Sequence, residues 1–282
     1  MKNGLSAVIF IPDDTAKFGS VQPLMLQSVL GAPLLTWLTS TLCAEGIGRF
    51  FLVCHDRYVA QAKACLPSNA EVMTSADSNP VDQLHVFLST ADDDEQEVTI
   101  ITGPTVYLPM LKRQGTPRKA NACCVSRESL MDALDTEFSF SQFLRENGAI
   151  LSDNEGFFSV ESPAACMEIV TLLRRDRMLR LQEQGVEIFD CDTCYVAPTV
   201  RIEPGAKLLP GAMLGGRSLI RSGAVIGPWS RVEDSEIGED CVINASQVYA
   251  SQIPASVYIG PFALIREGVN QNEAPRQWAA TH

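Results

Sequence analysis

Hydrophobic positions recur every six residues in the last third of the chain. A small residue or valine stands two positions before each of them, and glycine or proline fills the turns between. An α-helix repeats its face every 3.6 residues and a strand every 2, so neither element explains this spacing. A period of six predicts a chain that turns a corner after each short strand, which is the hexapeptide repeat pattern. The repeating positions are Ile202, Leu208, Leu214, Ile220, Ile226 and Val232.

The repeat continues past Val232 with one interruption. Ile237 follows after five positions, and the pattern resumes through Ile243, Ile259 and Ile265. Three edges make one coil of a triangular prism, so roughly four coils are expected from Val196 onward. The alternative is an antiparallel β-domain with chance spacing, and six unbroken repeats favour the coil. This register places Arg221 outside, where its replacement by aspartate should be mild.

The first half of the chain alternates short apolar runs with longer amphipathic segments. This order is typical of a parallel sheet flanked by helices. The expected strands are Leu5–Ile11, Arg49–Cys54 and Val98–Thr102, and the expected helices are near Pro33–Glu45, Tyr58–Cys65 and Asp82–Ser89.

A helix from Cys166 to Gln184 should join the two halves, with Gly185 as its stop signal. Its four arginines are expected to lie on a solvated face or to meet acidic loops, and a phosphate-binding role is the minority interpretation. We therefore expect an α/β domain over 1–165, a linker helix over 166–185, a β-helix over 186–270 and a tail over 271–282.

Composition favours two folded units in a reducing compartment. The chain has 282 residues, 46% of them hydrophobic, and a net charge of −12 with an acidic run over 92–95. No basic patch offsets that charge, which argues against nucleic acid or an anionic membrane as a partner. Nine cysteines without a recognisable signal peptide favour the cytoplasm. No apolar run reaches the ~18 residues that would span a bilayer.

Cys191 and Cys194 form a C-x-x-C pair that could indicate zinc. A structural zinc site needs four ligands, and no second pair or nearby histidine follows. We therefore expect small packable residues at the first turn of the β-helix. The Cys123-Cys124 pair is expected in a buried strand.

A polar turn follows the first strand, where open α/β sheets bind ligands. The turn reads Pro12-Asp13-Asp14-Thr15-Ala16-Lys17. A second strand end, running from Ile101 through Gly103 to Thr105, should lie beside it. The sequence thus predicts a ligand site at this edge of the sheet.

Several stretches resemble the bacterial bifunctional N-acetylglucosamine-1-phosphate uridyltransferase / glucosamine-1-phosphate acetyltransferase family. GVEIFD, VIGPWSRVEDSEIGEDCVI and YIGPFALIREG are similar to its linker and first coils, and AVIF, PLMLQSVLGAPLL and RFFLVCHD to its opening strand, loop, helix and second strand. The resemblance implies a Rossmann-like nucleotidyltransferase α/β domain, here truncated, followed by a short left-handed parallel β-helix. It also implies a homotrimer assembled through the β-helix.

The chain departs from the family at its phosphate loop. The family reads L-A-A-G-x-G-T-R-M, whose backbone N–H groups cradle phosphates. Here the same register lacks both glycines, Pro12 has no N–H to donate, and two aspartates stand where an anion should bind. Only Lys17 keeps the charge of the family's arginine. The nucleotide-binding candidates that the resemblance implies are Ile11, Pro12, Asp13, Thr15, Lys17 and Gly103.

Other family motifs are also changed. The catalytic lysine falls at Leu24, the uracil loop near Thr74 to Val81, the metal-binding aspartate at Pro104 and the second metal ligand near Ser162. We therefore expect no metal or other cofactor at the site. About a dozen residues between Leu108 and Asn121 replace the segment that closes over the sugar. Acetyl transfer needs a basic histidine in later coils, and none precedes His282, so this activity is not expected.

Two hypotheses remain, and they belong to different classes. The first is a shortened, motif-degenerate pseudoenzyme that acts in binding, scaffolding or regulation, with a nucleotide or nucleotide-sugar as a candidate ligand. The alternative is an active nucleotidyltransferase in nucleotide-sugar synthesis, with Lys17 on phosphate and Asp13 or Asp14 on Mg²⁺. An acyltransferase or an unrelated small-molecule binder is less favoured. The orientation of the two aspartates separates the first two.

Overall fold

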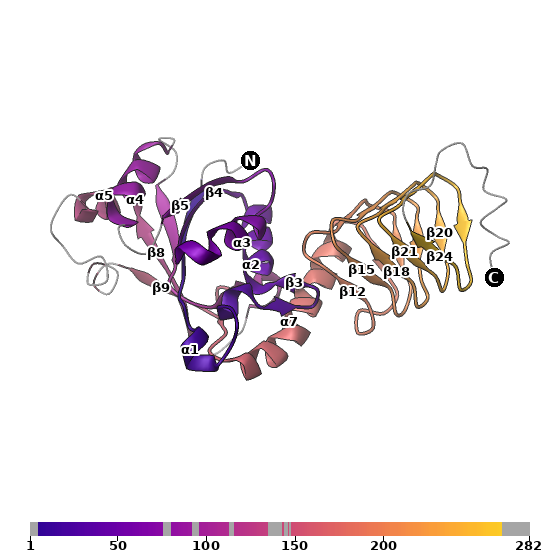
Figure 1. Ribbon diagram of the computed structural model, residues 1–282, viewed down its shortest axis with the longest axis horizontal. Helices are drawn as coiled ribbons and strands as arrows, with labels where there is room; N and C mark the ends of the chain where they lie inside the picture. Colours follow the sequence, from indigo (N-terminus) through magenta and orange to yellow (C-terminus); the bar gives the residue numbers. More distant parts are fainter. Residues whose placement is uncertain are drawn as a thin grey trace. The chain divides into compact units, whose positions relative to one another are not determined.

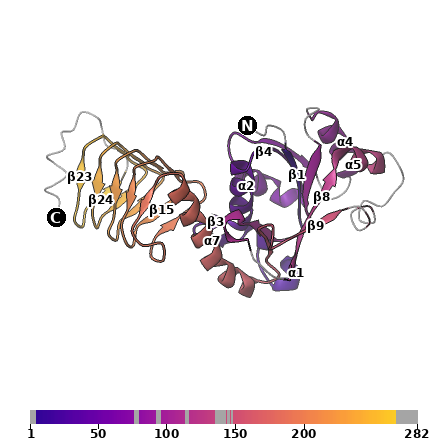
Figure 2. The same ribbon diagram turned by 180° about the vertical axis from the view of Figure 1, so that it is seen from behind.

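The structure, a computed structural model, describes residues 5–75, 80–91, 96–112, 116–134, 143, 146 and 148–266. Two compact units divide the chain, one formed by 1–29 and 33–169 and the other by 30–32 and 170–282. Figures 1 and 2 show them from opposite sides. The acidic run over 92–95, the tail over 271–282 and the centre of the expected uracil loop, 76–79, lie outside the described residues.

The first unit is a six-stranded sheet with helices on both faces. The strand order is β5-β4-β1-β6-β8-β9. One core cluster joins the sheet to α2 and α3, and another joins it to α4 and α5. The strands are β1 (Leu5–Ile11), β4 (Ile47–Cys54), β5 (Glu71–Ser75), β6 (Glu97–Ile101), β8 (Lys119–Ser126) and β9 (Ala149–Ser152), and the helices are α2 (Leu34–Ala44), α3 (Val59–Ala64), α4 (Pro80–Ser89) and α5 (Arg127–Leu134).

The predicted elements of this unit form within two residues of their expected bounds. The apolar run that predicts β1 arises because the strand is covered on both faces. Ala7 and Ile9 face one core cluster, and Val8 faces the other. A strand buried on both sides reads as an unbroken apolar run. The polar residues that flank such a run mark the ends of the strand in the sequence.

The sheet is mixed, so the prediction of a parallel sheet is wrong for β8, which runs against the other five strands. β1 pairs in parallel with β4 and β6, but β8 runs antiparallel to both β6 and β9. No crossover helix lies between β6 and β8 in the described residues of that connection, 102–112 and 116–118. Only short elements occur there, and a chain that returns without a crossover pairs antiparallel.

Short elements complete the first unit and its junction with the second. β7 and β10 form a small antiparallel pair, and β2 pairs with β3. The short elements are α1 (Thr15–Phe18), η1 (Leu24–Leu26), β2 (Ser28–Val29), β3 (Ala32–Pro33), η2 (Asp56–Tyr58), β7 (Thr105–Tyr107), η3 (Pro109–Leu111) and β10 (Phe157–Ser159).

The long helix α7 (Pro163–Glu183) begins in the first unit and ends in the second. Gly185 follows it with φ +86°, which confirms the predicted stop signal. Two arginines bind the first coil: Arg174 donates to the Tyr195 hydroxyl at 3.3 Å, and Arg177 to the Val200 carbonyl at 2.6 Å. Burial lowers the pKa of Arg177 to about 10. Arg174 also pairs with Asp192 of the loop before β12 at 3.3 Å, as expected of an arginine that meets an acidic loop. The sequence did not indicate that the buried Arg177 would fasten α7 to the repeats.

The second unit is a prism of short parallel strands in three sheets of five, five and four strands (Figure 1). Its core is a column of fully buried aliphatic residues that includes Ile220, Ile226 and Val232, each contributing about 1.5–3 kcal/mol. The strands are β11 (Glu187–Ile188), β12 (Tyr195–Val196), β13 (Arg201–Ile202), β14 (Lys207–Leu208), β15 (Met213–Gly215), β16 (Leu219–Ile220), β17 (Val225–Ile226), β18 (Arg231–Glu233), β19 (Glu236–Ile237), β20 (Val242–Ile243), β21 (Gln247–Tyr249), β22 (Gln252–Ile253), β23 (Tyr258–Ile259) and β24 (Leu264–Arg266).

The interruption in the repeat shortens a corner without breaking the stack. Ile237 still pairs with Ile220, and Val248 with Val232. Many corner residues take a left-handed backbone: glycine does so in the earlier coils, as at Gly211 with φ +77°, and other residues do so later, as at Trp229 with φ +53°. Such a conformation costs about 1–2 kcal/mol in a residue other than glycine.

These observations confirm the predicted fold class, a Rossmann-like α/β unit followed by a short left-handed parallel β-helix. Within the described residues, the helices are all too short or too polar to cross a bilayer.

Candidate functional site

The predicted ligand loop leaves the sheet at the end of β1. Ile11 is the last residue of the strand and is buried, while Pro12 is exposed. Asp13, Asp14 and the short helix α1 follow, and Lys17 lies on that helix. The structure thus brings the five candidates that fall between Ile11 and Lys17 to the edge where ligands bind open α/β sheets.

Asp13 occupies the groups that an anion would need in this loop. Its Oδ1 accepts from the Thr15 hydroxyl at 2.6 Å and from the Thr15 backbone N–H at 3.4 Å. Its Oδ2 accepts from the guanidinium of Arg57. The pKa of Asp13 is lowered, first by the Thr15 hydroxyl and then by the Thr15 N–H and Arg57. The chain's own carboxylate therefore takes up both Thr15 donors and one N–H of the Arg57 guanidinium.

Asp14 and Lys17 also have partners within the first unit. The Asp14 carboxylate accepts from the backbone N–H of Leu24 at 2.9 Å, and Leu24 is itself fully buried. The Lys17 ammonium lies over the Phe18 ring, 4.8 Å from its centroid. Asp14 therefore serves to close the loop over 14–24, and the two aspartates point to different partners.

The second strand end lies beside the first, because β6 pairs in parallel with β1 up to Ile101 opposite Ile9. Gly103 packs against the side chain of Asn121, 3.3 Å from where a Cβ would stand. The carbonyl of Pro104 accepts from the Val160 N–H at 2.9 Å. The segment after β6 is thus held by contacts with Asn121 and Val160 of the same unit.

Arg57 is the site residue that sequence reasoning missed. It lies in η2, directly after β4 ends at Cys54, and Cys54 pairs with Ile11. Parallel neighbours end at one edge of a sheet, so the loop after β4 had to approach the loop after β1. That topological signal could have drawn attention to Arg57, but only the structure shows its contact with Asp13.

The carboxylate at Asp13 gives the loop a predicted dependence on pH. The folded pKa lies below the ordinary value of 3.8. The stabilisation is therefore fully present above pH 3.8 and is lost as the pH falls through the lower, folded value. We expect Asp13→Asn to lower the unfolding temperature slightly at neutral pH and to match the wild type in strong acid.

Thermal unfolding from neutral pH to pH 2.5 measures this effect, with Asp56→Asn as the control for a loss of charge on η2. A difference between wild type and Asp13→Asn that grows as the pH falls would contradict the assigned bonds.

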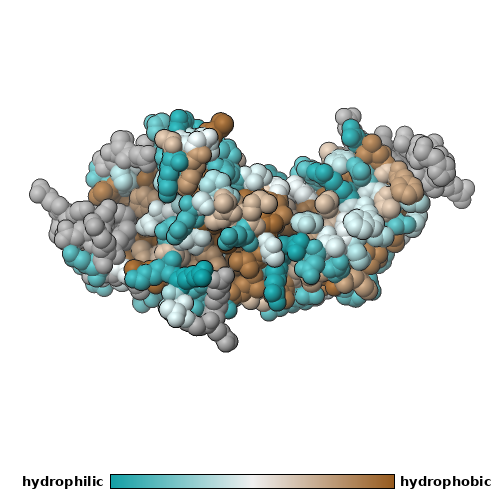
Figure 3. Space-filling model, turned by 90° about the horizontal axis from the view of Figure 1, so that it is seen from below, coloured by the Kyte–Doolittle hydropathy of each residue, from teal (hydrophilic) through white to brown (hydrophobic). Residues whose placement is uncertain are grey.

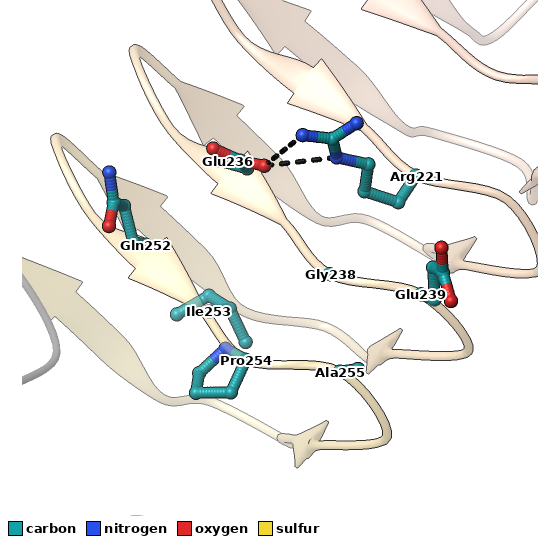
Figure 4. Close-up of a pocket in the computed structure, with 8 residues that line it drawn as sticks. All are labelled: Arg221, Glu236, Gly238, Glu239, Gln252, Ile253, Pro254 and Ala255. Carbon is teal, nitrogen blue, oxygen red and sulfur yellow. Dashed lines mark hydrogen bonds and ion pairs between the residues drawn. The ribbon is translucent and has the colours of Figure 1, made fainter. Parts of the chain in front are cut away.

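Two surface grooves lie on the second unit, whereas the ligand loop belongs to the first. One, of about 450 Å³, is shown in Figure 4. Beside it, Arg221 binds Glu236 at 2.6 Å and Glu203 at 2.9 Å. Arg221 is thus a clamp between coils, and the expectation that its replacement is mild is revised. The residues that line the groove are Arg221, Glu236, Gly238, Glu239, Gln252, Ile253, Pro254 and Ala255.

The clamp predicts a cost for reversing the charge at Arg221. Arg221→Asp would place a third carboxylate between Glu203 and Glu236, so we expect a clear fall in unfolding temperature that shrinks in 1 M salt, where the Debye length is about 3 Å. Arg201→Asp, on the same sheet, is the control and should change little. Equal unfolding temperatures for the two variants at low salt would show that the clamp does not stabilise the coils.

The residues that the resemblance aligns with metal ligands do not fit Mg²⁺. Pro104 offers no side-chain oxygen, and the Ser162 hydroxyl accepts from the Ala165 N–H at 3.1 Å, which caps α7. Within the described residues, three or more His, Cys, Asp or Glu side chains nowhere gather as ligands.

Cys194 lies in the core of the β-helix and donates to the Leu209 carbonyl at 3.3 Å. Burial raises the pKa of both Cys194 and Cys191, as expected for packed thiols.

Comparison with curated proteins identifies bifunctional GlmU proteins among the relatives of this chain. The bifunctional protein GlmU of Thermoanaerobacter pseudethanolicus is 38% identical over 119 residues, which cover 42% of this chain and 26% of that protein. GlmU of Thermotoga maritima is 36% identical over 96 residues, which cover 34% of this chain and 22% of that protein. The matches thus span about a quarter of the relatives' length. No family model matches the chain.

Two solved structures are similar at low identity. The inositol-1-phosphate CTP transferase of T. maritima has a TM-score of 0.46 at 11% identity, covering 61% of this chain and 96% of that one. The 4-diphosphocytidyl-2C-methyl-D-erythritol synthase of Anaerococcus prevotii has a TM-score of 0.39 at 10% identity, covering 62% and 100%. The sequence matches confirm the resemblance stated from the motifs, and the chain is a GlmU-related protein.

Proposed function

We propose that this GlmU-related chain has lost uridylyl transfer and acts by binding, as a scaffold or regulatory protein. One observation supports this most: Asp13 takes up the Thr15 hydroxyl, the Thr15 N–H and the Arg57 guanidinium. A nucleotide phosphate would need those donors. It would have to displace a carboxylate of its own sign to reach them.

Electrostatics of the loop point the same way. The residues beyond β1 and β4 include Asp13, Asp14 and Asp56 against Lys17 and Arg57. A loop that already carries more negative than positive side chains disfavours a triphosphate. Mg²⁺ could offset that charge, but Asp13 and Asp14 bind different partners and do not converge on one ion.

The alternative, an active enzyme with a remodelled site, depends on a shared metal at the two aspartates and on Lys17 reaching phosphate. Asp14 binds the Leu24 N–H, and Lys17 stacks on Phe18. Both contacts would have to break before catalysis. They weigh against the alternative.

Pyrophosphate release from UTP and N-acetylglucosamine-1-phosphate with Mg²⁺ tests the proposal. One lost charge-stabilising donor costs about 10²–10³ in rate, so the changes at the phosphate loop, at Leu24 and at Pro104 should remove about 10⁶-fold or more if they add. We expect no release above background. Turnover that disappears in Lys17→Ala would overturn the proposal and establish the remodelled enzyme.

Calorimetry separates binding from turnover. UTP and UDP-N-acetylglucosamine are titrated with and without Mg²⁺ into wild type and Asp13→Ala. If Asp13 occupies the anion-binding donors, the variant should bind UTP more tightly than the wild type. Weaker binding by the variant would show that Asp13 assists the ligand, contrary to the proposal.

A further inference from the structure

One corner of the β-helix presents two exposed aromatic rings in a row along the stack. Gly211, Trp229, Ala245 and Phe262 each stand two residues before a strand of one sheet, namely β15, β18, β21 and β24. Backbone bonds join the row, as where the Phe262 N–H donates to the Ala245 carbonyl at 2.9 Å. Trp229 is 73% exposed and Phe262 is 85% exposed. We call these four residues the aromatic edge.

The Trp229 ring lies flat on this corner. A Cβ built at Gly211 would lie 2.5, 2.9 and 3.0 Å from three adjacent carbons of the indole. Such similar distances to adjacent ring carbons mean that the glycine lies under a face of the ring and not at its edge. One face of the ring therefore rests on Gly211, and the exposed opposite face can receive a ligand.

The second groove of this unit adjoins the ring. Its volume is about 430 Å³, which is within the range of small-molecule sites, and its lining includes Asp192, Met213, Trp229, Arg231 and Gln247. Hydrophobic side chains scattered among hydrophilic ones are ordinary on a protein surface, as on the face drawn in Figure 3. What distinguishes the groove is a flat aromatic face with polar side chains beside it.

The polar side chains of the groove offer both donors and acceptors of hydrogen bonds. The Nε and Nη2 of Arg231 are bonded within the chain, and so is the Oε1 of Gln247. Within the part of the chain that the structure describes, the Arg231 Nη1 and the Gln247 Nε2 have no hydrogen-bond partner, and neither does the Asp192 Oδ2. The Asp192 side chain is 90% exposed. These atoms are therefore available to a ligand.

The charges around the groove are balanced. Arg231 pairs with Glu233 at 2.8 Å, and Asp192 pairs with Arg174 at 3.3 Å. A neutral ligand with several hydroxyl groups would meet the available donors and acceptors without leaving a charge unpaired. A sugar ring has such hydroxyls, and its C–H face stacks on the apolar face of an aromatic ring.

The spacing of the two rings indicates a chain of sugars. Trp229 and Phe262 are two coils apart, which is about 9.6 Å along the stack at the usual strand separation. An extended β-1,4-linked chain of pyranoses turns each ring over relative to the last, so every second ring presents the same face. Two sugar residues of such a chain span nearly the distance between Trp229 and Phe262. The small side chain of Ala245 leaves room for the sugar between them.

A proline-rich peptide is the competing occupant, because a polyproline II helix repeats every three residues, at about 9.3 Å. Its backbone offers carbonyl acceptors and few donors, so the Asp192 Oδ2 would gain no bond. Such peptides dock in aromatic-lined grooves, whereas the Trp229 ring lies flat on Gly211. These two observations favour the sugar chain.

We propose that the aromatic edge and the adjoining groove form a binding site for a neutral β-1,4-linked oligosaccharide. Alternate sugar rings stack on Trp229 and Phe262, and the hydroxyls of the sugars beside Trp229 bond Asp192, Arg231 and Gln247. The site lies in the second unit, so it does not depend on whether the phosphate loop of the first unit binds a nucleotide. It needs no catalytic activity either.

Calorimetry of the full chain with cellohexaose, and with its N-acetylated counterpart chitohexaose, tests the proposal. At least one of the two hexasaccharides should bind. The matching disaccharide is too short to bridge both rings, so it should bind about tenfold more weakly or worse. Maltohexaose has α-1,4 linkages and curls, so its rings do not follow a straight row and it should not bind.

Removing either aromatic ring should weaken the binding of the hexasaccharide. Trp229→Ala and Phe262→Ala each remove one stacking surface, so each should raise the dissociation constant about tenfold or more. Trp229→Phe keeps an aromatic ring and should keep most of the affinity. Tyr258→Ala removes an exposed aromatic residue on another sheet, so it is the control and should bind like the wild type.

Absence of binding by both hexasaccharides overturns the proposal, and so does equal affinity for maltohexaose. Binding of decaproline in their place, lost in Trp229→Ala, would assign the aromatic edge to a peptide. Equal affinity of folded Trp229→Ala and wild type also contradicts the proposal.

Circular dichroism establishes that each variant is folded. If Trp229→Ala is not, tryptophan emission of the Trp278→Phe protein decides, because Trp37 is buried and Trp229 is exposed. The emission must change as the hexasaccharide is added, and an unchanged spectrum contradicts stacking on Trp229.

Discussion

Replacing Ile226 with aspartate is expected to unfold the β-helix. Ile226 is fully buried in the aliphatic column, between Leu208 and Ile243 on the neighbouring coils. A carboxylate there has no cation or donor to meet it, and burying an unpaired charged or polar group costs several kcal/mol, among the largest effects of single substitutions. We expect circular dichroism and denaturant titration to show the loss of the second unit's cooperative transition.

Val225→Asp is the matched control, one position away on the same strand. Val225 faces outward from β17, so its carboxylate would remain hydrated. The register predicts a large difference between the two variants, because neighbouring residues of a strand face opposite sides. Equal stability of Ile226→Asp and Val225→Asp would show that the six-residue register is wrong.

Adding one methyl group at Gly238 is expected to destabilise the stack by about 1–3 kcal/mol, the usual cost of overpacking. A Cβ at Gly238 would lie 2.6 Å from the Ala255 nitrogen and 2.7 Å from the Pro254 carbonyl carbon. Both are backbone atoms of the next coil, so no side chain can turn aside. The coils would have to separate locally. Urea unfolding of Gly238→Ala measures the loss.

Gly215→Ala serves as the comparison, because neither glycine has a positive φ. At Gly215 the nearest atom to a new Cβ is the Glu233 Cγ at 3.5 Å, which is ordinary contact. We expect this variant to unfold at the urea concentration of the wild type. If Gly215→Ala loses as much stability as Gly238→Ala, close coil packing does not explain the glycine at 238.

The sequence predicted best those features that repeat or that are covered on both faces. The small residues beside the turns and the inward aliphatic residues recur at each coil, so the period of six was enough to predict the fold of the second unit. Ile237 keeps its pairing with Ile220 although the corner before it is one residue shorter. In the first unit, β1 and β4 read as apolar runs because both faces are buried. The antiparallel direction of β8 left no such trace, since alternation of side chains is the same in either direction.

The contacts of the candidate site were beyond the reach of local patterns. Asp13 and Arg57 are 44 positions apart, and Glu203 and Arg221 are 18 apart. Nothing in the neighbouring residues of either indicates which side chain it meets. The sequence could show that the phosphate loop had lost its glycines and gained carboxylates. Only the fold shows that one of those carboxylates, Asp13, binds Arg57 from the loop after the neighbouring strand β4.

Helix α7 supports the first coils of the β-helix in addition to the pairing between their strands. A stack in which every coil binds only its neighbours behaves as a one-dimensional lattice, whose end members fray first. Met178 and Leu181 of α7 join the core of the first coils, and Arg177 bonds Val200. In the described residues, β23 and β24 each pair with a strand on one side only. The first coils should thus resist fraying more than a coil that strand pairing alone holds.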